Sequence, residues 1–232
     1  NQKSNYKNII KELKIYSKKY SKPVALLVRK NSFDKTFHKK INNQNKLSRE
    51  RSLELVYDSI PIGSNIISTT GMISRELNEL NYKKKHNIFM CVGGMGHAIS
   101  IASGIAISKK KRIYCFDGDG SFLMHLGSST ISSNLDNLVH IVFNNQSHDS
   151  VGGQKTCASN LNLAKVAKSL GYKYTKKLNT EKDIKKFFKL NNMLKGSVFL
   201  EISCRKGNRN NLSRPKKNLT IYKQKFMNLI SN

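Results

Sequence analysis

The sequence predicts an α/β fold with a doubly wound, mostly parallel sheet and helices on both faces. Short apolar runs alternate with segments of helical periodicity over most of the chain, and the glycine-rich or polar turns follow the apolar runs. Strands that alternate with helices pair in parallel through right-handed crossovers. The 232 residues suffice for one full-size domain of this kind with some extra length.

The first part of the chain lies outside this alternation. Residues 3–20 carry apolar side chains at helical spacing and predict an amphipathic helix. Val24–Val28 is interpreted as a short buried strand, and the polar stretch 31–46, which has no periodicity, as a linker. We therefore expect two regions, residues 1–46 and residues 47–232.

The second region begins with a helix. Ser48 is its predicted N-cap, Glu50 lies in its first turn, and the helix runs to about Ile60. Alternating strands and helices follow. The predicted strands cover 65–68, 88–92, 112–116, 138–143, 172–174 and 197–204, and the predicted helices cover 73–80, 97–108, 161–170, 181–190 and 222–230, with one more helix after residue 121.

Glycine-rich or polar turns follow four of these strands, near Gly71, Gly94, Gly118 and Asn144. In open parallel sheets, ligands bind beyond the carboxyl ends of the strands. We therefore expect the four turns to meet at one edge of the sheet and to form a site there.

Two of the turns carry a specific chemistry. The tetrapeptide Gly118–Ser121 ends one strand, and the Asn-Asn pair at 144–145 ends the next, about one βαβ unit later. Glycine allows close approach of the backbone to an anion, and Ser121 with the amides of the next helix can face phosphate oxygens. The Asp119 carboxylate and the Asn145 amide are oxygen ligands that Mg²⁺ prefers. Together the turns predict a metal-bridged diphosphate site.

The same two turns resemble the signature of thiamine-diphosphate enzymes. The wider sequence is similar to phosphonopyruvate decarboxylases, with sulfopyruvate decarboxylases as close relatives, and the resemblance runs from about Val24 to Met227. It rests on the segments 68–76, 94–98 and 144–154, and on 205–207 and 214–215 near the end.

The resemblance implies a carboxy-lyase that uses thiamine diphosphate and Mg²⁺ to decarboxylate a small anionic 2-oxoacid. The expected reaction converts 3-phosphonopyruvate to phosphonoacetaldehyde and CO₂. Two alternatives stay open. One is a sulfopyruvate decarboxylase subunit, and the other is another thiamine-diphosphate enzyme, such as one similar to acetolactate synthase. From another class, a noncatalytic basic binding domain with the same fold is the alternative.

The resemblance also implies a partner. Such enzymes take an activating Glu from a pyrimidine-binding domain, and no such domain is recognised in this sequence. Either the sequence is truncated at its N-terminus or a second subunit supplies the domain. Residues 1–46 resemble the tail of such a domain, which favours truncation. A homo-oligomer is expected.

Position by position, the resemblance implies roles for individual residues. The Asp119 carboxylate, the Asn145 side chain and the Ser147 carbonyl would bind Mg²⁺. Met95 would be the apolar wedge beneath the bent cofactor, with ordinary core packing as its alternative. The expected cofactor contacts are Thr70, Gly71, Gly94, Met95, His97, Gly118, Gly120, Ser121, Asn145, Ser147 and His148.

His148 and His97 are the candidate catalytic residues, since both are expected near the strand ends. His148 lies in the loop after Asn145, where it can meet substrate or cofactor. The alternative for His97 is a contact with a nearby carbonyl or a phosphate. The glycines of the segment 150–154 would let that loop close over the site. Arg75 is a candidate for binding a phosphonate or sulfonate, unless it is a solvated surface residue.

Composition limits the other functions. The net charge of +28 can attract anionic ligands, but the basic residues are spread along the chain and no aromatic–Arg platform accompanies them, so nucleic-acid binding is not expected. The four cysteines form no CxxC pair, and buried free thiols are expected. No apolar run reaches the roughly 18 residues of a membrane span, and a cytoplasmic protein is expected.

Overall fold

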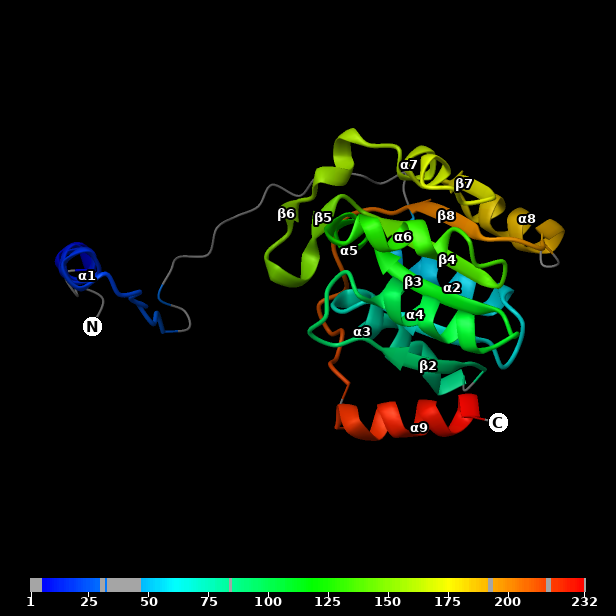
Figure 1. Cartoon of the computed structure of the whole chain (residues 1–232), viewed down its shortest axis with the longest axis horizontal. Coiled ribbons are helices and arrows are strands. Elements are labelled where there is room, and N and C mark those ends of the chain that lie inside the picture. Colours follow the sequence, from blue (N-terminus) through cyan, green and yellow to red (C-terminus); the bar gives the residue numbers. More distant parts are fainter. Residues whose placement is uncertain are drawn as a thin grey trace. The chain divides into compact units, whose positions relative to one another are not determined.

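The computed structural model describes residues 6–29, 32, 47–83, 85–191, 194–215 and 218–231. It divides into two compact units, Asn1–Asn42 and Asn43–Asn232. Figure 1 traces both units along the chain. The candidate site belongs to the second unit, so the first is described only briefly.

The first unit contains helix α1 (Tyr6–Tyr20), as the apolar spacing predicts. The prediction of a buried strand at Val24–Val28 is wrong. These residues form no strand, and Leu27 is 93% exposed. A β-strand is stable only when its backbone groups pair with a neighbour, and no described residue pairs with this segment. Nearly all of the predicted linker 31–46 lies outside the described residues.

The second unit is built on a six-stranded parallel sheet with strand order β2-β1-β3-β4-β8-β7. The predicted fold class is confirmed. A small antiparallel pair, β5 with β6, lies apart from the sheet. The strands are β1 (Asn65–Ser68), β2 (Asn87–Met90), β3 (Ile113–Gly118), β4 (Leu138–Asn144), β5 (Ser147–His148), β6 (Gln154–Lys155), β7 (Tyr174–Leu178) and β8 (Val198–Ser203).

Helices cover both faces of the sheet (Figure 1). One face is packed by α2, α3 and α8, and the other by α4, α7 and α9. The helices are α2 (Arg49–Ser59), α3 (Met72–Leu80), α4 (Ala98–Ser108), α5 (Asp119–Met124), α6 (Ser129–Ser132), α7 (Leu163–Ser169), α8 (Glu181–Asn191) and α9 (Leu219–Ser231), with 3₁₀ turns at Asn81–Lys83, Leu126–Ser128, Asp149–Val151 and Cys157–Asn160.

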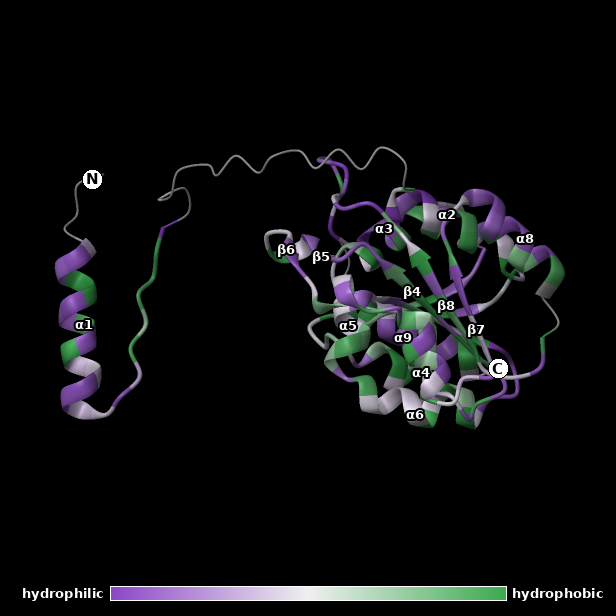
Figure 2. Cartoon of the chain, turned by 90° about the horizontal axis from the view of Figure 1, so that it is seen from above, coloured by the Kyte–Doolittle hydropathy of each residue, from purple (hydrophilic) through white to green (hydrophobic). Residues whose placement is uncertain are grey.

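The core follows from the strand pattern. Every residue of β1, β4 and β8 is buried, as expected for strands covered on both faces. Figure 2 shows hydrophobic residues concentrated on the inner strands, with hydrophilic residues on the outer sides of α2 and α8. The two edge strands differ from this pattern, because three residues of β2 are half-buried and three residues of β7 are exposed. Strand β7 begins at Tyr174, two residues later than predicted, and Tyr172 is buried but precedes the strand.

The strand order fixes where a ligand can enter. The chain leaves β1 toward β2 and leaves β3 toward β4, which lie on opposite sides of this neighbouring pair. Connections that diverge in this way open a crevice at the carboxyl ends of the two strands. The turns after β1, β3 and β4 border this crevice.

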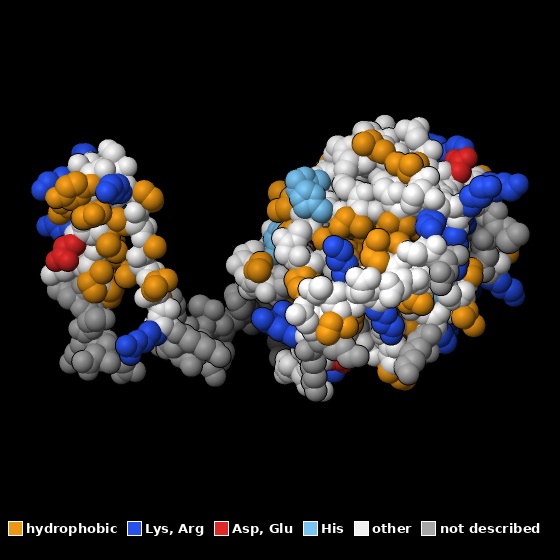
Figure 3. Space-filling model, turned by 60° about the horizontal axis from the view of Figure 1, so that its bottom comes forward, with side chains coloured by type: hydrophobic (Ala, Val, Ile, Leu, Met, Phe, Trp, Pro, Cys, Tyr) orange, Lys and Arg blue, Asp and Glu red, His pale blue; other side chains and the backbone are white. Residues whose placement is uncertain are grey.

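The surface agrees with the composition. On the face shown in Figure 3, Lys and Arg side chains are scattered among uncharged groups. Cys91, Cys115 and Cys204 are buried and Cys157 is exposed, and all four are free thiols. Within the described ranges, none of the helices has the length and apolar character that crossing a bilayer requires.

Candidate functional site

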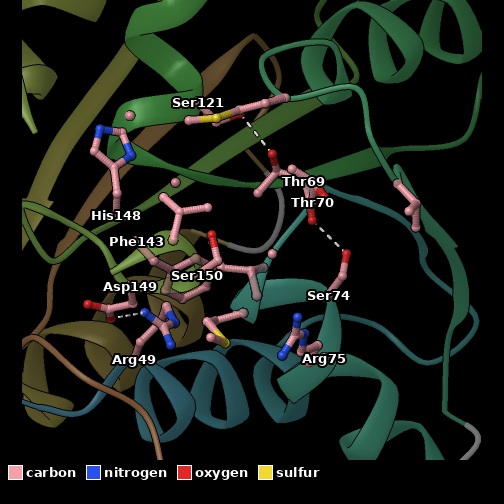
Figure 4. Close-up of a pocket in the computed structure, with 18 of the residues that line it drawn as sticks. Arg49, Thr69, Thr70, Ser74, Arg75, Ser121, Phe143, His148, Asp149 and Ser150 are labelled. Atoms are coloured by element: carbon pink, nitrogen blue, oxygen red, sulfur yellow. Dashed lines mark hydrogen bonds and ion pairs between the residues drawn. The ribbon is translucent and has the colours of Figure 1, made fainter. Parts of the chain in front are cut away.

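A pocket of about 720 Å³ lies at the carboxyl ends of β1, β3 and β4. Figure 4 shows its lining side chains converging from the turns after these strands and from α2 and α3. The volume is within the usual range for small-molecule and cofactor sites. The pocket is lined by Arg49, Thr69–Arg75, Val92, Met95, Gly118–Ser121, Phe143, Asn145, Ser147–Val151, Arg214, Pro215, Asn218 and Leu219.

Three of the turns are joined at the Ser121 hydroxyl. Its Oγ lies 2.8 Å from Thr69 Oγ1 and accepts a hydrogen bond of 3.0 Å from the Gly96 backbone N–H. The Thr69 backbone N–H in turn donates to the Phe116 carbonyl of β3. The buried Ser121 side chain therefore fixes the turns after β1, β2 and β3 relative to one another.

Asp119 opens α5 directly after β3 and is 3% exposed. Its carboxylate accepts a hydrogen bond from the Thr156 hydroxyl. Burial raises the pKa of Asp119, although hydrogen bonds from Thr156 and from the Asp119 and Gly120 amides act in the opposite direction. A cation beside a buried carboxylate favours its ionised form.

The two asparagines that end β4 have different surroundings. Asn144 points into the structure, where its amide N–H donates to Glu201 Oε1 at 2.9 Å and its Oδ1 accepts from the Gln146 N–H at 3.2 Å. Glu201 is fully buried and also accepts from the Ala164 N–H in the first turn of α7. Asn144 therefore braces the turn, and Asn145 faces the pocket.

Asn145 is held at both ends of its amide. Its Nδ2 donates to Asp149 Oδ2 at 2.6 Å, and its Oδ1 accepts from the Ser147 N–H at 3.2 Å. Between them, Gln146 has a φ of +58°, a conformation rarely adopted by residues other than glycine. Such backbone conformations persist when the surrounding structure fixes them, and they concentrate at functional sites.

The residues present fit a hard divalent cation. The buried Asp119 carboxylate and the Asn145 amide oxygen follow adjacent strands of the sheet and line one pocket. Ser147 Oγ is buried and has no hydrogen-bond partner among the described residues. Carboxylate, amide and hydroxyl or carbonyl oxygens are the donors that Mg²⁺ takes, with water and phosphate completing its octahedron.

Gly120 lies where side chains approach the backbone closely. A Cβ at this position would meet His148 Cε1 at 2.6 Å and Met95 Cε at 3.3 Å. His148 and Met95 thus flank the backbone that follows Asp119, and both line the pocket. On the opposite side, Gly71 has a φ of +95°, and a Cβ there would meet Ser150 Oγ at 3.4 Å. The loop after β5 therefore lies against the turn after β1.

The structure brings most of the predicted site residues together, but not all of them. Gly94 and His97 do not line the pocket. His97 is exposed, and its ring packs on that of His125 with centroids 4.3 Å apart. The predicted residues that do line the pocket are Thr70, Gly71, Arg75, Met95, Gly118, Asp119, Gly120, Ser121, Asn145, Ser147 and His148.

Sequence reasoning missed three polar contributors, Thr69, Arg49 and Asp149. Thr69 adjoins the predicted Thr70, and Asp149 lies within the 144–154 segment that carries the family resemblance. Arg49 gave no local signal, because its partners Glu76 and Asp149 lie 27 and 100 residues away. Arg75 also lines the pocket, and among the described residues its guanidinium has no ion pair.

Comparison with known proteins identifies the family of this domain. The model of the family described as thiamine pyrophosphate enzyme, C-terminal TPP binding domain, matches residues 69–202. The chain is 35% identical over 171 residues to phosphonopyruvate decarboxylase of Streptomyces viridochromogenes, an alignment that covers 73% of this chain and 43% of the relative. This chain therefore spans less than half the length of that relative.

A second relative is more similar in length. The chain is 31% identical over 182 residues to the sulfopyruvate decarboxylase subunit beta of Methanococcus maripaludis, covering 77% of this chain and 92% of that subunit. Among solved structures, benzoylformate decarboxylase from Polynucleobacter necessarius matches with a TM-score of 0.58 at 16% identity, over 75% of this chain and 36% of that one. This last similarity concerns the fold alone.

Proposed function

The chain belongs to the thiamine pyrophosphate enzymes, as their C-terminal TPP-binding domain, and from this premise we propose that it forms the diphosphate- and Mg²⁺-binding half of a 2-oxoacid decarboxylase. The observation that carries the proposal is the pair Asp119 and Asn145. These two oxygen donors follow adjacent strands and line the same pocket. The family resemblance predicted from the sequence is confirmed.

The proposed reaction is the decarboxylation of 3-phosphonopyruvate to phosphonoacetaldehyde and CO₂. The identity of 35% to a phosphonopyruvate decarboxylase supports this substrate. When bound, thiamine diphosphate supplies a nucleophilic carbon and an electron sink for this reaction. The protein contributes binding, orientation and the exclusion of water. These tasks can be assigned to individual residues of the pocket.

Asp119, the Asn145 amide oxygen and the Ser147 carbonyl would hold Mg²⁺, and the cation would neutralise the diphosphate. The buried Asp119 carboxylate supports this assignment, because burial raises its pKa and an adjacent cation would favour its ionised form. The backbone at Gly118 and Gly120 would lie against the diphosphate. The Ser121 hydroxyl is already bonded to Thr69 and the Gly96 amide, so its main contribution would be to fix the turns.

Met95 and His148 would act on the reacting end of the cofactor. Met95 lines the pocket beside Gly120, where its apolar side chain would pack against the cofactor. His148 approaches the same backbone from strand β5 and would exchange a proton with substrate or product. Thr70 and Gly71 would contact the cofactor from the turn after β1.

Arg75 would bind the phosphonate of the substrate. Arg49 cannot do so, because it is engaged with Glu76 and Asp149. Arg75 lines the pocket from α3 without an ion pair among the described residues, and Arg214 lines it from the segment before α9. A doubly charged headgroup in the pocket would therefore have two arginines in its lining, Arg75 and Arg214.

Full activity would require a pyrimidine-binding domain that supplies an activating Glu, with residues 1–46 as the tail of such a domain and residues 47–232 as the diphosphate domain. A homo-oligomeric enzyme of this kind is part of the proposal. A cytoplasmic location is also proposed, and the buried free thiols of Cys91, Cys115 and Cys204 suit a reducing compartment.

A sulfopyruvate decarboxylase subunit is the second candidate. The alignment with the Methanococcus maripaludis subunit beta covers 92% of that subunit, so this candidate suits a two-chain enzyme. Phosphonate and sulfonate headgroups differ in charge and protonation, which makes their discrimination measurable.

Two experiments test the proposal. The purified chain should gain thermal stability when Mg²⁺ and thiamine diphosphate are added together, because a ligand that binds the native state raises the melting temperature. The chain should also be co-expressed with the polypeptide encoded directly upstream, and aldehyde and CO₂ release measured from phosphonopyruvate, sulfopyruvate and pyruvate. Faster turnover of phosphonopyruvate is expected. No thermal shift with cofactor would overturn the proposal, and a preference for sulfopyruvate would select the second candidate.

A further inference from the structure

A buried ion-pair cluster, here called the Arg49 cluster, lies beside the pocket and consists of Arg49, Glu76 and Asp149. Arg49 donates to both oxygens of Glu76, from Nε at 2.9 Å and from Nη2 at 2.8 Å. Its Nη1 donates to Asp149 Oδ2 at 2.7 Å. The side chains of Arg49, Glu76 and Asp149 are 4%, 1% and 6% exposed. Figure 4 shows Arg49 and Asp149 side by side, on the side of the pocket opposite Ser121.

One oxygen of Asp149 joins three separate segments of the chain. Asp149 Oδ2 accepts from Arg49 of α2, from Asn145 Nδ2 after β4 at 2.6 Å, and from the Gly207 backbone N–H at 3.0 Å. The segment that contains Gly207 follows β8 and leads toward α9. The position of this carboxylate is therefore determined by contacts from several elements and not by its own loop alone.

The Asp149 contact determines which way the Asn145 amide points. An ionised carboxylate only accepts hydrogen bonds, so the NH₂ end of Asn145 must face Asp149. The amide oxygen is then directed away from Asp149, where it accepts from the Ser147 N–H. An amide that is free to turn would present NH₂ to a cation as readily as oxygen, and only the oxygen can be a metal ligand.

The charge of the cluster also favours this arrangement. The guanidinium of Arg49 stands against two carboxylates, Glu76 and Asp149, in a buried site. Burial acts to lower the pKa of Arg49, but hydrogen bonds and charges of Glu76 and Asp149 raise it above its ordinary value overall. Arg49 thus stays charged and holds the Asp149 carboxylate in place beside Asn145.

We propose that Asp149, held by Arg49, is a positioning residue that orients the Asn145 amide oxygen for Mg²⁺. The inference rests on the proposed function, because it takes Asn145 as a ligand of the cation. Partners that orient metal ligands typically change metal affinity by about 10- to 100-fold when they are replaced. The affinity for Mg²⁺ should therefore depend on the ion pair between Arg49 and Asp149, although neither residue touches the metal.

The test uses Asp149→Asn in the full chain. This nearly isosteric change leaves the Arg49–Glu76 pair intact and allows Asn145 to turn its amide. We expect about 10- to 100-fold weaker Mg²⁺ binding in calorimetry with saturating thiamine diphosphate, and the same direction with inorganic pyrophosphate as the probe. Arg49→Lys, which keeps the charge but loses the forked geometry, should give a smaller loss. Arg51→Gln is the matched control, since Arg51 lies on the same helix as Arg49 but forms exposed ion pairs.

Two further readouts separate positioning from a structural role. In the co-expressed enzyme, Asp149→Asn should raise the Mg²⁺ concentration needed for half-maximal activity, while kcat recovers at high Mg²⁺. The proposal is overturned if Asp149→Asn lowers the metal-free melting temperature and leaves Mg²⁺ affinity as in Arg51→Gln. If the wild-type chain itself does not bind Mg²⁺ with thiamine diphosphate, the proposed function fails together with this inference.

Discussion

Two buried polar networks, one between β3 and β4 and one beyond the end of β4, differ in what they hold. The core network consists of Asp117, His140 and Tyr172, each at most 1% exposed. His140 contacts Asp117 Oδ2 at 3.3 Å through Nε2 and Tyr172 Oη at 3.1 Å through Nδ1. Asp117 Oδ1 accepts from the Gly118 N–H. The core network therefore positions backbone, whereas the Arg49 cluster positions the side chain of Asn145 in the pocket.

The comparison shows that burial and residue type do not by themselves mark a metal site. The ligand atoms of Cys115, Asp117 and His140 all lie within 4.8 Å of one another, a spacing that a cation could use. However, Asp117 and His140 have hydrogen-bond partners within the core, and none of the three lines the pocket. Asp119, two residues after Asp117, is equally buried but faces the pocket.

The largest expected effect separates these two aspartates. Asp119→Ala should reduce Mg²⁺-dependent binding of thiamine diphosphate by more than about 100-fold, because a charged ligand of the cation is lost. The metal-free melting temperature should fall little, since burial already disfavours this carboxylate. Calorimetry and thermal melts with and without Mg²⁺ measure both quantities. Binding that survives in Asp119→Ala would place the cation elsewhere.

The next effect concerns the core network. His140→Phe keeps an aromatic ring in the core but removes the shared hydrogen-bond partner of Asp117 and Tyr172, which should lower the free energy of unfolding by about 3 kcal/mol. The affinity for Mg²⁺ and thiamine diphosphate should stay within about twofold of wild type at temperatures where the variant is folded. Urea unfolding and calorimetry test this pair of outcomes. A tenfold loss of affinity at unchanged stability would make the core network part of the site.

A smaller effect is expected for Gly120→Ala. The added Cβ would meet His148 Cε1 at 2.6 Å, so the imidazole must leave its present position. Small-to-large changes at packed positions typically cost about 1–3 kcal/mol, and we expect cofactor affinity to fall about tenfold. The matched control is Gly127→Ala, since a Cβ there would have open space around it. Equal cofactor affinities of the two variants would show that the close approach of His148 to Gly120 does not matter for cofactor binding.

The smallest effect should appear at Arg75. Arg75→Gln should raise the KM for phosphonopyruvate about tenfold in the co-expressed enzyme, as expected for one lost contact to a charged headgroup. Affinity for Mg²⁺ and thiamine diphosphate should not change, because Arg75 is proposed to contact substrate only. Arg75→Lys should recover part of the loss. A KM equal to that of wild type would assign the headgroup to other residues, with Arg214 as the next to replace.

Local sequence patterns predicted the sheet because its strands are short, apolar and separated by turns with glycine or asparagine. Ser48 was correctly predicted as a helix cap, and its Oγ accepts from the Arg51 N–H at 3.1 Å. Val24–Val28 was mispredicted for the same reason, since an apolar run indicates a strand whether or not a partner strand is present. The fold of residues 47–232 could thus be predicted from local patterns. Whether a given apolar run finds a partner strand could not be predicted in this way.

The candidate site was predictable where chemistry lies on a strand end and unpredictable where it depends on distant pairing. Asp119 and Asn145 follow predicted strands, so the parallel topology alone brings them together. The ion pair between Arg49 and Asp149 joins residues that are 100 positions apart, and no sequence pattern near Arg49 predicts it. Likewise, the contact between His97 and His125, which lies outside the pocket lining, depends on where α4 begins and α5 ends.

The central claim is that Asp119 and Asn145 share one cation at the ends of β3 and β4. The most direct measurement is a crystal structure of the chain with Mn²⁺ and thiamine diphosphate, with the ion located by anomalous diffraction. The account predicts one peak at about 2.0–2.3 Å from both the Asp119 carboxylate and the Asn145 amide oxygen, close to the distances of octahedral oxygen ligands. A peak at Cys115, Asp117 and His140, or a separation of Asp119 from Asn145 too large for a shared ion, would contradict it.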